Sequence, residues 1–99
     1  MQIERLRQIV ERLRAPDGCP WDREQTHRSL KPHLLEECYE LLDAIDAQDD
    51  SELKEELGDL LLQVVMHAQM ASEEQRFTLD DVAGVTADKL VNRHPHVFG

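Results

Sequence analysis

The stretch from Leu57 to Met70 reads LGDLLLQVVMHAQM, and its apolar residues fall on almost every side of a helix. A surface helix carries a single apolar stripe, whereas a helix that is apolar all round is buried. We therefore expect a helix over about Ser51–Glu73 that is buried on all sides and forms the core of the fold. Asp50 or Ser51 is the expected N-cap of this helix.

Amphipathic helices are expected on both sides of this core helix. Three further stretches repeat apolar residues every three or four positions: Ile3–Leu13, Leu34–Ile45 and Leu79–Arg93. Pro32 is tolerable in the first turn of the second of these helices, and Thr78 with Asp81 resembles a capping box at the start of the last. The segment WDREQTHRSL, residues 21–30, is expected to be a loop with at most one helical turn. No segment alternates with period two, so the sequence predicts an all-α fold of four helices.

Length, charge and cysteine content limit the function classes. A chain of 99 residues is a single small domain, 1–99, that can bury little surface alone, so a second copy is a plausible partner. With 21 acidic and 11 basic residues the net charge is −10, which disfavours nucleic acid polymers and anionic membranes as partners. Cys19 and Cys38 match no zinc or redox spacing. The N-terminus lacks a signal peptide, and we expect a cytoplasmic protein with free thiols.

Acidic residues concentrate in EECYELLDAIDAQDDSELKEELGD, residues 36–59. In the second helix Glu36, Glu40 and Asp43 fall nearly in line, with Glu37 about 100° round the helix. This face lies opposite the apolar stripe. Taken alone, it has the composition of a face exposed to water.

The third helix makes a metal site a competing interpretation. Glu56 and Asp59 lie on a line that continues into Gln63 and Met66, which are expected to be buried. A buried carboxylate is normally protonated, paired with a base or bound to a metal. Lys54 is the only lysine or arginine within the acidic stretch, so bases for pairing are scarce.

Two pairs of carboxylates, each three residues apart, can converge from facing helices. The pairs are Glu37 with Glu40 and Glu56 with Asp59. Four oxygen ligands suit Mg²⁺ or Mn²⁺ much better than zinc or copper, while a di-iron site would require Glu-x-x-His pairs that are absent. Gly58, unfavourable within a helix, suggests close approach of another helix. Spacing alone leaves the metal site and the solvated face both open.

Four motifs in order resemble the MazG-like nucleoside triphosphate pyrophosphohydrolases of the all-α NTP pyrophosphatase superfamily. They are CPWD at residue 19, EECYE at residue 36, EELGD at residue 55 and RHPHVF at residue 93. The resemblance runs from Leu6 to Gly99. It implies a homodimeric helical bundle that hydrolyses an NTP or dNTP to the monophosphate and pyrophosphate.

The resemblance also implies roles for individual residues. Magnesium would be held by the two pairs of carboxylates, and Glu36 would orient water or act as a base. Lys89 and Arg93 match basic residues near the triphosphate. Trp21 is a candidate for stacking on the base, with a cap over the bundle end as the alternative.

The histidines are given structural roles. His67 lies on the acidic line of the third helix, and we expect a core histidine rather than a contact with the site. His94 and His96 flank a proline after a helix and are expected to pack or cap rather than bind metal.

The resemblance further predicts a domain that is shortened at its C-terminus, because relatives usually continue beyond HPHVFG. Two functions are therefore considered. The first is a magnesium-dependent pyrophosphohydrolase that removes surplus or non-canonical nucleotides. The second is a non-catalytic dimerisation or nucleotide-sensing module that keeps the fold and the metal site.

Overall fold

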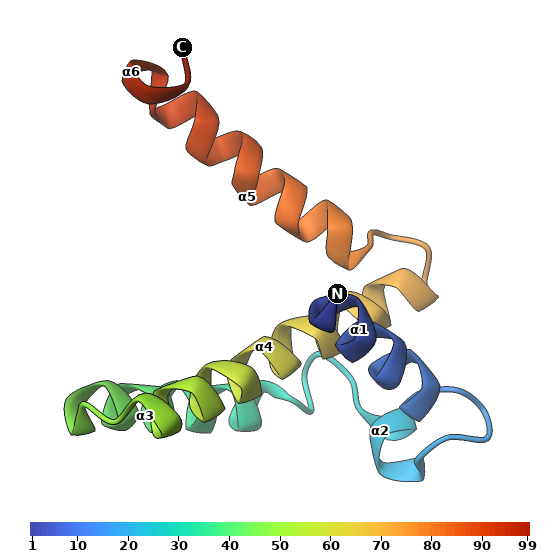
Figure 1. Ribbon diagram of the computed structural model, residues 1–99. Helices are drawn as coiled ribbons and strands as arrows, with labels where there is room; N and C mark the ends of the chain where they lie inside the picture. Colours follow the sequence, from blue (N-terminus) through green and yellow to red (C-terminus); the bar gives the residue numbers. More distant parts are fainter.

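The computed structural model describes residues 1–99 and contains helices and no strands (Figure 1). The helices are α1 Gln2–Leu13, α2 Pro20–Glu24, α3 Lys31–Ala47, α4 Asp50–Glu73, α5 Leu79–Arg93 and α6 Pro95–Phe98. The all-α class and the four long helices predicted from apolar spacing are thus confirmed. The short α2 is the single turn expected between the first two of them. The four-residue α6 was not anticipated.

Two helix starts show how local side chains fix the element boundaries. The capping box predicted at α5 is present, since Thr78 Oγ1 accepts from the amide of Asp81 at 3.1 Å and Asp81 Oδ2 accepts from the amide of Thr78 at 2.9 Å. The predicted cap of α4 is wrong by one residue. Asp49 has the extended backbone of an N-cap, and its Oδ1 accepts from the amides of Ser51 and Glu52 at 2.9 and 3.3 Å.

The core forms where α1 crosses the C-terminal half of α4 (Figure 1). A two-residue connection joins α3 and α4 into an antiparallel hairpin, and Gln48 takes a left-handed conformation there. The buried core cluster consists of Val10, Leu30, Val65, Met66 and Met70. Its members come from α1, from the residue before α3 and from α4, so three parts of the chain meet at one end of the hairpin.

The prediction that α4 is buried on all sides is wrong. The buried residues of α4 all lie between Gln63 and Ala71, because α1 covers only that part of the helix. Leu57, Leu62 and Val64 remain 49%, 36% and 40% exposed. A Cβ on Gly58 would meet no atom within 4 Å, so the close helix approach expected there does not occur within the chain.

The fifth helix leaves the body of the molecule. It contacts the end of α4, follows a turn in which Gln75 has a positive φ of 60°, and buries none of its residues (Figure 1). One chain therefore forms a hairpin with α1 across it and α5 projecting away. The chain does not close into a bundle by itself, and the expected bundle completed by a second copy stays a prediction. No helix is both long and apolar enough to span a membrane.

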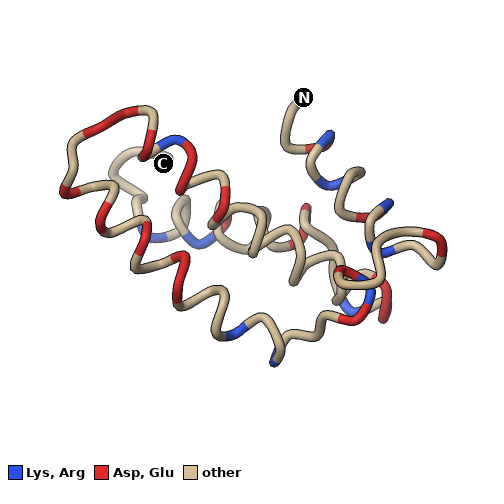
Figure 2. Tube along the Cα trace, turned by 90° about the horizontal axis from the view of Figure 1, so that it is seen from below, with Lys and Arg blue, Asp and Glu red and all other residues tan.

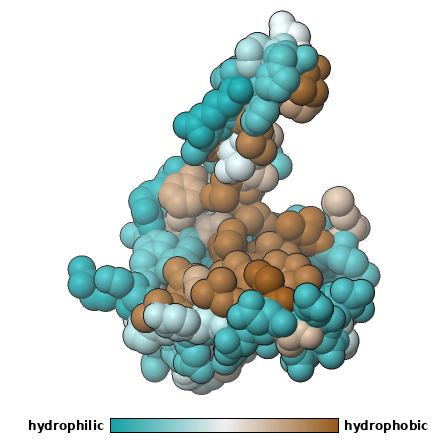
Figure 3. All heavy atoms as spheres, turned by 90° about the vertical axis from the view of Figure 1, so that its left-hand side faces the viewer, coloured by the Kyte–Doolittle hydropathy of each residue, from teal (hydrophilic) through white to brown (hydrophobic).

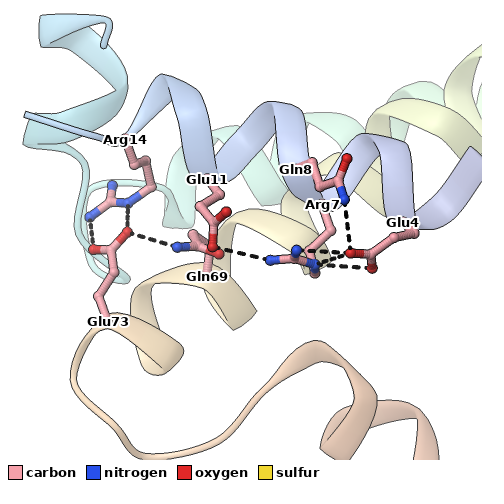
Figure 4. A network of polar contacts seen from close by, with 7 residues as sticks. All are labelled: Glu4, Arg7, Gln8, Glu11, Arg14, Gln69 and Glu73. Carbon is pink, nitrogen blue, oxygen red and sulfur yellow. Dashed lines mark hydrogen bonds and ion pairs between the residues drawn. The ribbon is translucent and has the colours of Figure 1, made fainter. Parts of the chain in front are cut away.

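Arg14, just after α1, ties that helix to its neighbours (Figure 4). Its guanidinium binds both carboxylate oxygens of Glu73 at 2.9 and 3.0 Å and donates to the carbonyls of Asp22 and Gln25 at 2.6 and 3.2 Å. The Arg14 side chain is only 9% exposed. This interaction lowers the pKa of the Glu73 carboxyl and joins α1, α2 and the end of α4.

Candidate functional site

The α3–α4 hairpin brings the two predicted pairs of carboxylates together. Glu37 and Glu40 lie one turn apart on α3, and Glu56 and Asp59 lie one turn apart on α4. Carboxylate oxygens of Glu37, Glu56 and Asp59 all lie within 4.8 Å of one another, and all four residues are half-buried. Figure 2 shows acidic residues along both helices of the hairpin and at its closed end.

Crowding and burial in this cluster disfavour the ionised carboxylates. Burial, followed by the charges of Glu40 and Glu37, raises the pKa of Glu56 to about 7. Burial, followed by the charges of Glu40 and Asp59, also raises the pKa of Glu37. The charge of Glu40 thus raises the pKa of both Glu37 and Glu56, which makes Glu40 the fourth member of the carboxylate cluster. Without a cation the cluster retains protons that free carboxyl groups would lose.

Two oxygens of the cluster have no partner. Glu37 Oε2 and Glu56 Oε2 are buried and form no hydrogen bond, and no lysine, arginine or histidine forms an ion pair with any of the four acids. Buried acceptors normally find a donor or a cation. An all-oxygen set of converging carboxylates without an internal base has the donor chemistry that Mg²⁺ and Mn²⁺ prefer, so the residues present fit such an ion.

Comparison with known proteins is consistent with this geometry. Residues 25–98 match the MazG nucleotide pyrophosphohydrolase domain. The chain belongs to the MazG family. All four clustered carboxylates lie within the matched region of this MazG domain.

Three relatives align with almost the whole chain. The nucleoside triphosphate pyrophosphohydrolase/pyrophosphatase MazG of Thermotoga maritima is 62% identical over 97 residues, which are 98% of this chain and 38% of that protein. The nucleoside triphosphate pyrophosphohydrolase of Escherichia coli K12 is 57% identical over 98% of this chain and 37% of its own length. The nucleoside triphosphate pyrophosphohydrolase of Mycobacterium tuberculosis is 55% identical over 91% of this chain and 28% of its own length. The chain therefore spans less than two-fifths of these relatives.

The other predicted site residues lie outside the carboxylate cluster of the MazG domain. Glu36 is exposed on α3 and does not join the group. Trp21 is 52% exposed on α2, with its ring edge-on to His33 at a centroid distance of 5.8 Å. Lys89 and Arg93 are exposed on α5, form no ion pair, and are carried away from the hairpin (Figure 1).

The histidines and cysteines lie outside the carboxylate cluster as well. His67 is half-buried and contacts another histidine rather than the acidic cluster. His94 Nδ1 lies 2.6 Å from the carbonyl of Leu90, as expected of a residue that caps α5, and neither His94 nor His96 belongs to a group with metal-ligand geometry. Cys19 and Cys38 are free.

Two polar residues were not recognised from the sequence as unusual. Gln63 follows Asp59 by one turn, is 9% exposed, and has a buried Oε1 without a partner. His27 contacts His67 across 40 residues of sequence. Its segment looked like an ordinary loop, and no spacing rule connects the two histidines.

Proposed function

We propose that this MazG domain hydrolyses nucleoside triphosphates to the monophosphate and pyrophosphate, with Mg²⁺ or Mn²⁺ held by Glu37, Glu40, Glu56 and Asp59. The observation that carries the proposal is the cluster of four half-buried carboxylates, two of which have buried oxygens without partners. The names of the relatives in Thermotoga maritima and Escherichia coli support the reaction type.

The protein's own groups have distinct parts in this reaction. A bound divalent cation neutralises phosphate charge and lowers the pKa of a coordinated water. The four carboxylates hold that cation and give up the protons that Glu37 and Glu56 retain without it. Glu36, exposed beside the cluster, is the proposed base that accepts a proton from the attacking water. A chain of net charge −10 repels a triphosphate unless a cation lies between them.

Nucleotide binding in this proposal draws on residues outside the hairpin. Lys89 and Arg93 have no anionic partner within the chain and are proposed to bind phosphate oxygens. Trp21 presents an exposed ring and is proposed to stack on the base. Because α5 points away from the cluster of its own chain, the contribution of the two basic residues depends on assembly with a second copy (Figure 1).

A homodimer is part of the proposal because one chain leaves much apolar surface open. Only ten of 99 residues are buried. Large apolar side chains are exposed on both helices of the hairpin: Leu35, Tyr39, Leu42 and Ile45 on α3, and Leu57, Leu62 and Val64 on α4. Figure 3 shows apolar atoms gathered across one side of the molecule and along the projecting α5. A surface of this kind typically marks a protein interface.

A non-catalytic dimerisation or nucleotide-sensing module remains the second candidate. It is favoured by the position of Lys89 and Arg93 away from the carboxylates within one chain. In this case metal and nucleotide bind without turnover. Removal of surplus or non-canonical nucleotides is the physiological role we propose for the first candidate.

A pyrophosphate-release assay over a panel of NTPs and dNTPs separates the candidates. With millimolar Mg²⁺ the enzyme yields equal amounts of monophosphate and pyrophosphate, and EDTA stops the reaction. Release of orthophosphate instead of pyrophosphate contradicts the proposed bond cleavage. Nucleotide binding by calorimetry without any product supports the sensing module.

A further inference from the structure

Three residues far apart in the sequence form a short chain of nitrogen contacts at the core end of the hairpin. His27 lies in the connection between α2 and α3, His67 lies on α4, and Arg76 lies in the turn after α4. The Nδ1 atoms of His27 and His67 are 2.7 Å apart, and the two ring planes lie 9° from parallel with centroids 4.9 Å apart. Arg76 Nη2 lies 2.7 Å from His27 Nε2.

These contacts permit only one arrangement of protons. A guanidinium only donates hydrogen bonds, so His27 Nε2 must accept from Arg76. A neutral His27 then carries its proton on Nδ1 and donates it to His67 Nδ1. His67 must therefore be neutral as well, with its proton on Nε2. That Nε2 is buried and has no hydrogen-bond partner.

A second proton on either ring breaks the chain of contacts. Protonated His27 would turn an N–H towards Arg76, and protonated His67 would turn an N–H towards the N–H of His27, in each case across 2.7 Å. Burial, followed by the neighbouring His27, lowers the pKa of His67, in agreement with this geometry.

The charged groups around the two rings offer no compensation for such a proton. Arg76 also donates to Glu74 at 3.0 Å, so this carboxylate is already paired with the arginine, and no carboxylate forms an ion pair with either histidine. From the end of α1, Arg14 binds the carbonyl of Gln25, two residues before His27, and adds a further positive charge. Neither α3 nor α5 forms a hydrogen bond to either ring. No carboxylate is therefore positioned to stabilise an imidazolium.

We propose that His27, His67 and Arg76 form a pH-sensitive clip, which holds the α2–α3 connection against α4 and the α4–α5 turn when both imidazoles are neutral and releases it on acidification. The clip joins the segment that follows Trp21 to the turn from which α5 departs. Its position two helical turns beyond Asp59 separates it from the carboxylate cluster, so the inference does not rest on the proposed function.

Amide hydrogen exchange tests the clip directly. Protection of residues 26–30 and 74–77 is measured at about pH 7.5 and pH 5.5 and corrected for intrinsic exchange. We expect protection at the lower pH to fall about tenfold for each imidazole that gains a proton, since pH 5.5 is about one unit below the ordinary histidine pKa. Amides of α4 between Val65 and Met70 should keep their protection.

The matched variants are His27→Asn and His33→Asn. An asparagine amide can rotate to donate to neutral His67 or accept from protonated His67, so His27→Asn should reduce the pH dependence to the part that arises from burial of His67. His33 lies exposed on α3 outside the clip, and His33→Asn should behave as the wild type. Equal wild-type protection at both pH values, or full pH dependence in His27→Asn, overturns the proposal.

Imidazole nitrogen NMR of the wild type provides a test that needs no variant. At neutral pH the clip requires His27 protonated on Nδ1 and His67 protonated on Nε2. Any other pair of tautomers overturns the proposal.

Discussion

At the scale of single residues, Glu56 gives the strongest support for the proposed metal site. Its carboxylate faces Glu37 and Asp59, has a buried oxygen without a partner, and holds its proton to about pH 7. Three-residue spacing on two helices showed that these acids could converge, but spacing alone left a face exposed to water equally open. Only the family resemblance set Glu36 apart from the ligands, since neighbouring glutamates on one helix differ only by rotation, and Glu36 is exposed outside the cluster.

The first residue-scale prediction concerns turnover. Glu56→Gln and Asp59→Asn each remove a proposed ligand, so the loss of several kcal/mol of transition-state stabilisation should lower kcat roughly 100-fold or more. Glu52→Gln is the matched control, because Glu52 lies one turn earlier on α4 and is exposed. Pyrophosphate release measures all three. Loss of activity in Glu52→Gln equal to that in Glu56→Gln would contradict the assignment.

The second residue-scale prediction is that the stability of the metal-free protein depends on pH through Glu56. Because folding raises the pKa of Glu56 to about 7, its stabilising contribution is complete below about pH 4.5 and is lost as the pH rises towards 7. The pKa of His67 is lowered, so its contribution to stability has the opposite pH dependence. The contribution of Glu56 must therefore be isolated by comparing the wild type with a Glu56 variant. In EDTA, the melting temperature of the wild type should fall further between pH 5 and pH 8 than that of Glu56→Gln. Identical profiles would show that Glu56 is not perturbed.

At the scale of helices, apolar spacing and capping residues predicted where each long element lies, and packing decided which faces are covered. The Thr78 capping box could be found from the sequence because it is local. The exposed half of α4 could not, since its composition suits either a core or an interface. The direction of α5 could not be predicted either, because it follows from the turn at Gln75 rather than from any helical pattern.

The element-scale prediction concerns the attachment of α1. Arg14→Met should lower the free energy of unfolding by about 2 kcal/mol, less than for a fully buried pair because Glu73 is 37% exposed and can regain water. Arg12→Met removes the exposed pair with Asp17 and should cost less than about 0.5 kcal/mol. Urea unfolding at constant m-value measures both. Equal effects would mean that Arg14 does not anchor the helix.

At the scale of the whole molecule, the open apolar faces of α3, α4 and α5 support the proposed homodimer. Sedimentation should therefore give a dimer at micromolar concentration. Leu42→Glu places a charge on the exposed line of α3 and should weaken association by about 2 kcal/mol or more, roughly 30-fold in Kd. Gln2→Glu adds the same charge at the start of α1 and should leave the dimer intact. A folded wild-type monomer would contradict the proposed assembly.

The claim that the four carboxylates form a metal site is tested most directly by Mn²⁺ titration, with free Mn²⁺ followed by electron paramagnetic resonance. We expect saturable binding to the wild type and to Glu52→Gln, and binding at least roughly tenfold weaker in Asp59→Asn, with circular dichroism confirming that each protein is folded. A folded Asp59→Asn protein that binds Mn²⁺ as tightly as the wild type would contradict the claim.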